Sequence, residues 1–147
     1  MPHRPAARPI YAALLIGGES MNKQFDQLRR GPRIIVGTPG RINDHLERRS
    51  LNLSGADFLV LDEADKMLDM GFHEDILKII RFLPAKRQNL LFSATFPSAI
   101  AAMSQAYQRN ALRVTITDPV DTSVEIEQWQ LAVEESEKAA PISNAAS

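Results

Sequence analysis

The chain has 147 residues, a formal net charge of −1, 44% hydrophobic residues and 24% charged residues. This composition is ordinary for a single soluble domain, and its charge alone gives no sign of a nucleic-acid or membrane partner. The sequence contains no cysteine, which excludes disulfides and thiolate metal sites and fits a cytoplasmic location. No run of about 18 apolar residues occurs, so we expect no transmembrane helix.

Short apolar segments follow one another along the chain in two alternating patterns. Continuous apolar or β-branched runs predict strands at residues 10–16, 33–37, 57–61, 89–94 and 112–117. Helical spacing of apolar residues, N-caps and prolines predict helices at residues 19–30, 38–49, 73–83 and 97–109. Alternating strands and helices predict an α/β fold, with a mostly parallel sheet and helices on both faces. Nearly continuous apolar runs favour strands that are buried on both sides.

The two ends of the chain have a different character. The apolar run at 10–16 ends in Gly17-Gly18 and not in a small-x-small cleavage site, which favours a buried strand over a signal peptide. After residue 118 the sequence is polar and has few large apolar residues. We therefore expect a domain over residues 1–118 and a connector, flexible at its end, over 119–147.

Three carboxylates stand where the apolar run 57–61 stops, namely Asp62, Glu63 and Asp65. Ligands of a parallel sheet bind beyond the carboxyl ends of its strands. Asp62 is placed to hold Mg²⁺ directly or through water, and Glu63 to orient or deprotonate an attacking water. The alternative is a solvated loop that begins a helix, and the carboxylates alone do not decide between the two.

The hydroxyl residues Ser93 and Thr95 end the next strand. They are placed to donate hydrogen bonds to Asp65 and so to connect two loops. The alternative is a helix cap ahead of Pro97, which would be the better interpretation of these two residues alone.

Two further strand ends carry groups that favour phosphate. The segment "TPGR" (38–41) begins a helix, where free backbone N–H groups and the helix dipole attract anions, and Arg41 adds a positive charge. The pair Gly17-Gly18 offers backbone amides that a polyanion can approach closely. A capped helix and a tight turn are the alternatives.

In this order, and each at a strand end, "GG" (17–18), "TPGR" (38–41), "DEAD" (62–65) and "SAT" (93–95) resemble the motifs of the DEAD-box RNA helicases. These enzymes of helicase superfamily two contain two RecA-like domains of the P-loop NTPase type. The resemblance covers roughly residues 10–131 and includes "DMGF" (69–72). It implies an incomplete first RecA-like domain, with "SVEIEQWQLAVEESEK" similar to the connector and the opening strand of the second.

The resemblance also implies a role for each matched residue. Asp62 would hold the Mg²⁺ of Mg–ATP through water, Glu63 would position the hydrolytic water, and Asp65, Ser93 and Thr95 would couple hydrolysis to the RNA site. The residues that would line the RNA backbone are Gly17, Gly18, Thr38, Pro39, Gly40 and Arg41. Contacts of this kind bind RNA independently of its base sequence. The expected cofactors are ATP and Mg²⁺, and the expected partners are RNA and a second RecA-like domain, in a monomer without membrane contact.

The chain lacks elements that this family pattern requires, the phosphate-binding loop first among them. It has no GxxxxGK[ST] loop, and none of its five lysines follows a glycine. In the family that loop lies upstream of "GG", and its strand lies between those corresponding to 89–94 and 112–117. We therefore expect exposed strand edges, lower stability and no ATP hydrolysis by this chain alone. The alternatives are a non-catalytic RNA-binding or interaction fragment and a gene remnant without independent function.

The remaining polar and aromatic candidates favour ordinary structural roles. His3, His45 and His73 are scattered along the sequence, so we expect surface or capping positions and no metal site beyond Mg²⁺. Tyr11 and Trp129 favour packing over base stacking.

Overall fold

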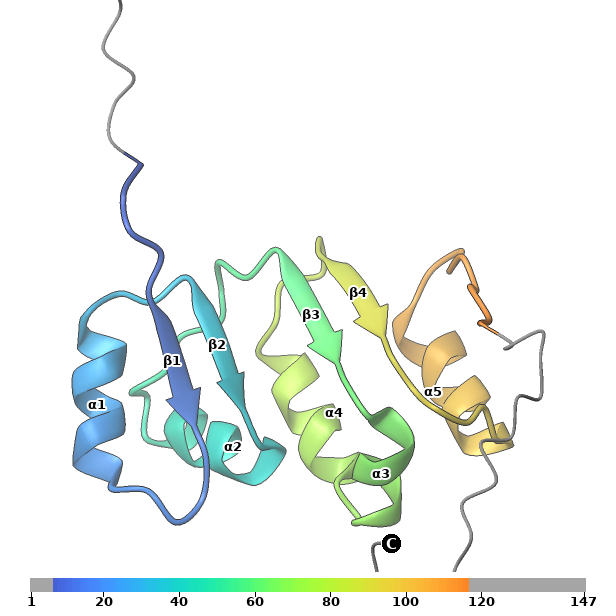
Figure 1. Cartoon of the computed structure of the whole chain (residues 1–147), viewed down its shortest axis with the longest axis horizontal. Coiled ribbons are helices and arrows are strands. Elements are labelled where there is room, and N and C mark those ends of the chain that lie inside the picture. Colours follow the sequence, from blue (N-terminus) through green and yellow to red (C-terminus); the bar gives the residue numbers. More distant parts are fainter. Residues whose placement is uncertain (1–6, 117–147) are drawn as a thin grey trace, which may run out of the picture. The chain divides into compact units, whose positions relative to one another are not determined.

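The computed structural model describes residues 7–116. The chain divides into two units, Met1–Ala111 and Leu112–Ser147, and every helix and strand of the described residues belongs to the first. Figure 1 shows these elements in chain order. Their bounds are β1 Ala12–Leu15, α1 Met21–Arg29, β2 Ile34–Gly37, α2 Pro39–Glu47, β3 Phe58–Leu61, α3 Ala64–Asp69, α4 His73–Arg81, β4 Gln88–Leu91 and α5 Ser98–Tyr107.

The strands form two parallel pairs. In the first pair β1 lies beside β2, with Leu15 opposite Gly37, and in the second β3 lies beside β4, with Leu61 opposite Leu91. Within residues 7–116 no hydrogen-bonded ladder joins β2 to β3, so each pair is a sheet of its own. All four strands run in the same direction (Figure 1), and their carboxyl ends therefore lie at one edge.

The segment predicted as a fifth strand is not one. Residues 112–116 have no strand structure, and residue 117 lies outside the described range. Leu112, Val114 and Ile116 are exposed. A parallel strand requires a neighbour that shares its backbone hydrogen bonds, and the described strands pair only within the two sheets. The apolar pattern of 112–117 therefore was not sufficient to identify a strand.

One helix of the structure was not predicted. The short helix α3 begins at Ala64, directly after the left-handed residue Glu63. The sequence analysis placed only a helix start here, because three acidic residues in four interrupt the apolar spacing that marks a helix.

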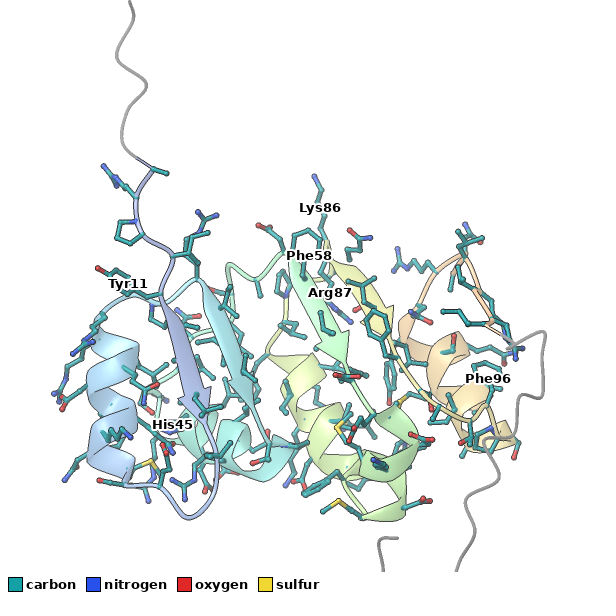
Figure 2. The ribbon with its side chains drawn as sticks, viewed as in Figure 1. Tyr11, His45, Phe58, Lys86, Arg87 and Phe96 are labelled. Atoms are coloured by element: carbon teal, nitrogen blue, oxygen red, sulfur yellow. The ribbon has the colours of Figure 1, made fainter. Side chains whose placement is uncertain are left out.

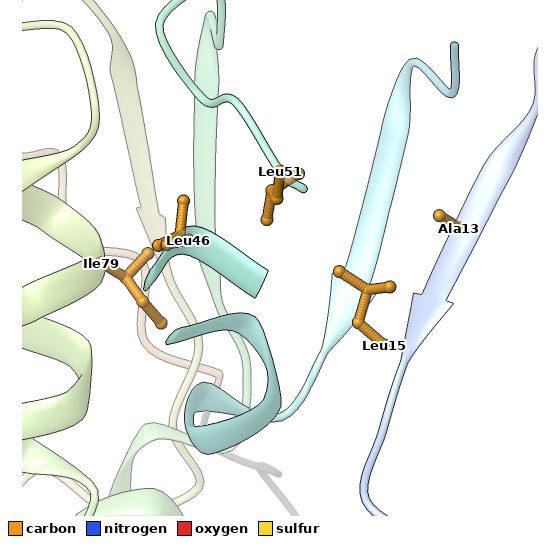
Figure 3. Packing of buried hydrophobic residues seen from close by; sticks show 5 residues of the cluster. All are labelled: Ala13, Leu15, Leu46, Leu51 and Ile79. Carbon is orange, nitrogen blue, oxygen red and sulfur yellow. The ribbon is translucent and has the colours of Figure 1, made fainter. Parts of the chain in front are cut away.

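The main core cluster lies between β1, α2 and α4 (Figure 3). Its members are Ala13, Leu15, Leu46, Leu51 and Ile79. A second connection between α2 and α4 is polar, since the amide of Asn43 donates to the backbone carbonyl of Asp75 at 3.0 Å. The predicted inner faces of the helices are confirmed at the buried residues Leu46, Ile76, Ile79, Ile100 and Met103.

The second face of the strands is open. Successive side chains of a strand point to opposite faces, and Ala13 and Leu15 of β1 are buried whereas Leu14 is exposed. The same alternation leaves a set of exposed apolar side chains on β1, β2 and β3, which we name the open apolar face: Leu14, Ile34, Val36, Phe58 and Val60. The apolar runs predicted strands that are buried on both faces, but the described strands are buried on one face only.

None of the helices within residues 7–116 is long and apolar enough to cross a membrane.

Candidate functional site at the strand ends

The turn after β3, residues 62–65, which we name the acidic turn, is anchored by its one apolar residue. Ala64 is fully buried, and its backbone N–H donates to the carbonyl of Phe92, just after β4, at 3.0 Å. The flanking carboxylates Asp62 and Glu63 are exposed. Asp62 Oδ1 accepts a hydrogen bond from the backbone N–H of Glu63 at 2.9 Å. The anchor thus holds a turn in which two acidic side chains face solvent.

Glu63 has an unusual backbone conformation. Its φ of 50° lies in the left-handed region, which costs free energy for any residue with a Cβ. Its side chain lies near Lys66, with Oε1 3.5 Å from Nζ, and both side chains are largely exposed. An exposed pair of this kind contributes little stability, so it does not explain the strained backbone.

Asp65 connects the loops after β3 and β4. Its Oδ2 accepts two hydrogen bonds from Thr95, at 3.1 Å from the backbone N–H and at 2.9 Å from the hydroxyl. Its Oδ1 accepts from the backbone N–H of Lys66 at 3.0 Å. Ser93 donates its hydroxyl to the carbonyl of Thr95 at 2.7 Å, which fixes the same loop. The hydrogen bond predicted between Asp65 and a hydroxyl of "SAT" is present.

These contacts shift the acidity of Asp65. Hydrogen bonds to the charged form, above all from the Thr95 hydroxyl, hold the pKa of Asp65 below its ordinary value. The carboxylate is therefore ionised and acts only as an acceptor at neutral pH.

The acidic turn does not by itself supply a complete set of metal ligands. Among residues 7–116, no group of three or more His, Asp or Glu side chains could hold a metal ion. Mg²⁺ in nucleotide sites, however, uses one or two carboxylates and takes its other ligands from water and phosphates. Asp62, exposed and with one oxygen bonded only to a backbone N–H, fits that mode of binding.

The loops after β1 and β2 expose backbone. A Cβ atom added to Gly17, Gly18 or Gly40 would meet no other atom within 4 Å, so nothing in the described part of the chain crowds them. Gly18 has a φ of 80°, a conformation that glycine adopts without strain. The backbone N–H of Thr38 donates to the carbonyl of Leu15 at 3.1 Å, which holds the start of α2 beside β1.

Pro39 and Arg41 lie at the start of α2. Pro39 is buried at the first helical position, as predicted. Arg41, predicted to add charge toward phosphate, has only 17% of its side chain exposed. Its Nη1 donates to the carbonyl of Glu19 at 3.2 Å, and its Nε lies 3.9 Å from Asp44 Oδ2. One nitrogen of the guanidinium therefore contacts the loop that carries Gly17 and Gly18.

Two buried polar residues beneath this loop were not predicted to be buried, and Gln24 was not named in the sequence analysis at all. Gln24 and His45 are both fully buried, and His45 Nε2 lies 2.7 Å from Gln24 Oε1. His45 was expected at the surface or at a cap, and that expectation is wrong (Figure 2). A signal was present for Gln24, which lies three residues after Met21 and four before Leu28 and hence on the predicted inner face of its helix.

The environment of His45 disfavours its charged form. Burial, followed by the positive charges of Arg41 and Arg48, lowers the pKa of His45, and Asp44 opposes this only in part. The imidazole is therefore neutral at pH 7.

The predicted site residues all follow the carboxyl ends of strands that run in one direction (Figure 1). Asp65 and Thr95 come into direct contact there. Arg41 comes into contact with the loop of Gly17 and Gly18 through Glu19.

The sequence of the chain is similar to those of known RNA helicases. The family described as DEAD/DEAH box helicase matches residues 5–103 of the chain. The chain is 52% identical over 114 residues to the ATP-dependent RNA helicase DbpA of Escherichia coli (strain K12), an alignment that covers 78% of the chain and 25% of that protein. It is 45% identical over 122 residues to the ATP-dependent RNA helicase CshA of Listeria monocytogenes serovar 1/2a, covering 83% of the chain and 24% of that protein. The chain thus spans about a quarter of the length of these curated relatives.

Solved structures agree with these relatives. A DEAD box protein from the hyperthermophile Methanococcus jannaschii superposes with a TM-score of 0.67 and 39% identity, covering 71% of this chain and 28% of that one. The yeast DEAD-box splicing factor Prp28 superposes with a TM-score of 0.65 and 34% identity, covering 68% and 23%. The α/β arrangement of parallel strands and helices is therefore that of the RecA-like DEAD-box domains.

Proposed function

This chain belongs to the DEAD/DEAH box helicase family, and on that premise we propose that it forms part of the first RecA-like domain of an ATP-dependent RNA helicase. In that role it binds the backbone of single-stranded RNA and couples ATP hydrolysis to local unwinding of RNA duplexes. The observation that carries the proposal is the contact of Asp65 with Thr95, which connects the acidic turn to the neighbouring strand end.

The nucleotide half of the proposed site is the acidic turn. Asp62 holds Mg²⁺ through water, and a carboxylate oxygen of Glu63 orients the attacking water. Bound Mg–ATP supplies the phosphoryl group that is transferred to that water. The exposure of both carboxylates and the anchor at Ala64 support these roles.

The coupling element is the contact between the loops after β3 and β4. Any displacement of the acidic turn that breaks the Asp65–Thr95 hydrogen bonds leaves an ionised carboxylate without its strongest partner. Ser93, which fixes the carbonyl of Thr95, resists such a displacement. We infer that these three residues transmit the state of the nucleotide to the neighbouring strand end.

The RNA half of the site is the surface made by two loops. Its proposed contacts are Gly17, Gly18, Thr38, Gly40 and Arg41, and Pro39, predicted from the sequence to lie among them, is buried and fixes the start of α2 instead. Open space at the three glycines, which allows close approach of a phosphate to the backbone, supports this assignment. Recognition through backbone amides and the N-terminus of α2 is independent of base sequence. A monomer in the cytoplasm, paired with a second RecA-like domain, completes the proposal.

RNA binding tests the proposal directly. A fluorescein-labelled ten-nucleotide oligo(U) is titrated with the 147-residue chain, and the anisotropy is followed at several salt concentrations. We expect Kd to rise with salt, because phosphate contacts release counterions, and to be the same for oligo(U) and oligo(A).

Three glycine variants make the test specific to the site. Gly17→Ala and Gly40→Ala add a methyl group where the RNA backbone approaches, and neither clashes within the chain. We expect each to raise Kd about fivefold, the equivalent of one hydrogen bond. Gly55→Ala, equally uncrowded but in the loop before β3, is the matched control and leaves Kd unchanged. Absence of RNA binding by the unaltered chain, or equal Kd for all three variants, would refute the RNA half of the proposal.

The nucleotide half needs a separate measurement. We expect no ATP turnover by the 147-residue chain alone, because its sequence has no GxxxxGK[ST] loop to hold the phosphates. Phosphate release is measured with and without RNA, beside the Glu63→Gln variant as a background control. Turnover that Glu63→Gln abolishes would show that this expectation is wrong and that the acidic turn is sufficient for catalysis.

A further inference from the structure

The two carbonyls that flank the Gly17-Gly18 pair are held by different side chains. On one side, Gln24 Nε2 donates to the carbonyl of Ile16 at 2.8 Å. On the other side, Arg41 Nη1 donates to the carbonyl of Glu19 at 3.2 Å. The loop is therefore fixed at both of its ends, whereas the glycines between are open.

A single oxygen connects the two fixed points. Gln24 Oε1 lies 3.4 Å from Arg41 Nη1 and 2.7 Å from His45 Nε2. Because an amide oxygen only accepts, both nitrogens donate to it. Gln24 is thus the centre of a hydrogen-bonded cluster, which we name the Gln24 cluster and which also contains Arg41, His45 and Ser50.

The cluster determines the tautomer of His45. The Nε2 atom carries the hydrogen, since its partner is the oxygen of Gln24, whose nitrogen is committed to Ile16. In the neutral ring Nδ1 is then an acceptor, and it lies 2.8 Å from the hydroxyl oxygen of Ser50, which also lies 3.1 Å from the backbone carbonyl oxygen of His45. Phe25 packs against the ring edge to face, with the ring centroids 5.5 Å apart. These contacts together hold the ring in one orientation.

We infer that Gln24 and His45 are positioning residues which hold the Gly17-Gly18 loop and Arg41 ready for the RNA backbone. This inference rests on the proposed function, because it concerns the same RNA surface. Both residues are fully buried, so neither is exposed to RNA at the surface. They act by fixing the loop before RNA arrives, so that the loop loses less conformational freedom on binding. A cluster that served stability alone would change the folding equilibrium and leave the affinity of the folded chain unaltered.

A matched pair of substitutions at His45 separates these two roles. His45→Gln keeps an N–H donor at nearly the position of Nε2, whereas His45→Leu removes it. We expect His45→Leu to raise the oligo(U) Kd about fivefold, and His45→Gln to restore a Kd close to that of the unaltered chain. Both are measured well below the melting temperature of each variant, so that only folded protein contributes.

Backbone ¹⁵N relaxation gives a readout that does not depend on RNA. We expect the order parameters of Gly17 and Gly18 to fall in His45→Leu and to recover in His45→Gln, with those of Gly55 unchanged. If the unaltered chain binds no RNA, the proposed function fails, whereas the relaxation data still test whether the cluster fixes the loop. A folded His45→Leu variant with unaltered Kd and unaltered order parameters would overturn the inference.

A second variant covers the case in which His45→Leu does not fold. Gln24→Glu keeps the acceptor for His45 and Arg41 but removes the donor to Ile16. We expect one end of the loop to be released, with the same loss of RNA affinity and of order at Gly17. Unchanged values for this variant would likewise overturn the inference.

Discussion

Thr95 donates two hydrogen bonds to one oxygen of Asp65, from its backbone at 3.1 Å and from its hydroxyl at 2.9 Å. The two residues are thirty positions apart in sequence, and the contact brings the ends of β3 and β4 together. Because every residue except proline supplies the backbone donor at position 95, the hydroxyl is the part that most substitutions remove.

Removal of this hydroxyl changes the acidity of Asp65. We expect Thr95→Val to raise the pKa of Asp65 toward its ordinary value, since the Thr95 hydroxyl is the largest cause of the lowered pKa. The carboxyl ¹³C resonance of Asp65, followed against pH, measures this shift. Thr95→Ser keeps a hydroxyl and should leave the titration unchanged, so equal titrations for Val and Ser would contradict the prediction.

The lowered pKa also fixes the sign of a pH dependence. A carboxyl whose pKa is lower in the folded than in the unfolded chain stabilises the fold above its unfolded pKa, and this contribution is lost as pH falls through the folded pKa. Asp65 therefore contributes to acid unfolding below about pH 4. In Thr95→Val, the free energy of unfolding should depend less on pH in that range.

His45 gives a dependence of the same sign nearer neutral pH. Its pKa is lowered in the folded chain by burial, Arg41 and Arg48, so the unfolded chain binds a proton more readily. The free energy of unfolding should therefore fall as pH decreases below about 6.5 and should not depend on this group above it. Urea unfolding of the unaltered chain and of His45→Gln at pH 5.5 and 7.5 measures the effect. His73→Gln, at an exposed histidine, is the control, and an equal pH dependence in both variants would count against the prediction.

Gly37 tests how closely β2 approaches β1. A Cβ atom at this position would collide with the backbone carbonyl oxygen of Leu15, its partner in the ladder, and would press on the side chain of Ile42. We expect Gly37→Ala to lower the free energy of unfolding by about 2 kcal/mol, a typical cost of overpacking. Circular dichroism during urea unfolding checks this, with Gly55→Ala, which meets no atom within 4 Å, as the control. Equal stability of the two variants would contradict the prediction and would show that β1 and β2 can move apart at little cost.

Glu63 allows the cost of its backbone conformation to be compared with the contribution of its side-chain contacts. Its φ of 50° is unfavourable for a side chain with a Cβ, and we expect Glu63→Gly to raise the free energy of unfolding by about 1 kcal/mol. Arg49, with a φ of 58°, is a matched control for the backbone effect, and Arg49→Gly should stabilise by a similar amount. If Arg49→Gly stabilises and Glu63→Gly does not, contacts of the Glu63 side chain outweigh its backbone strain.

Much of the fold follows from local patterns in the sequence. Apolar spacing identified four of the five helices found within residues 7–116, and the inward residues of α4 and α5, such as Ile76 and Met103, are buried as predicted. The spacing failed for α3, where the acidic residues mask the helix, and for 112–116, where the apolar pattern lacks a strand to pair with. The division into two sheets was not predicted either, because strand pairing depends on which strands are neighbours in space.

The site was predictable to the extent that it follows strand ends. The motif order placed Asp65 and Thr95 at neighbouring strand ends, where they meet. The burial of Arg41 against Glu19 could not be predicted from the sequence, because a charged residue at the start of a helix is usually exposed. Gln24 fits the spacing of the inner face of its helix, but its hydrogen bond to His45 joins two different helices, and such a contact leaves no signal in the sequence of either helix.

The open apolar face has a consequence for how the chain behaves in different salts. Its exposed side chains, from Leu14 to Val60, favour contact with other apolar surfaces, and this attraction strengthens in sulfate and on warming from low temperature. RNA bound through its phosphates, as proposed above, would by contrast be released as salt increases. As sulfate is added, the chain should therefore bind RNA at low ionic strength and associate with other protein surfaces at high ionic strength.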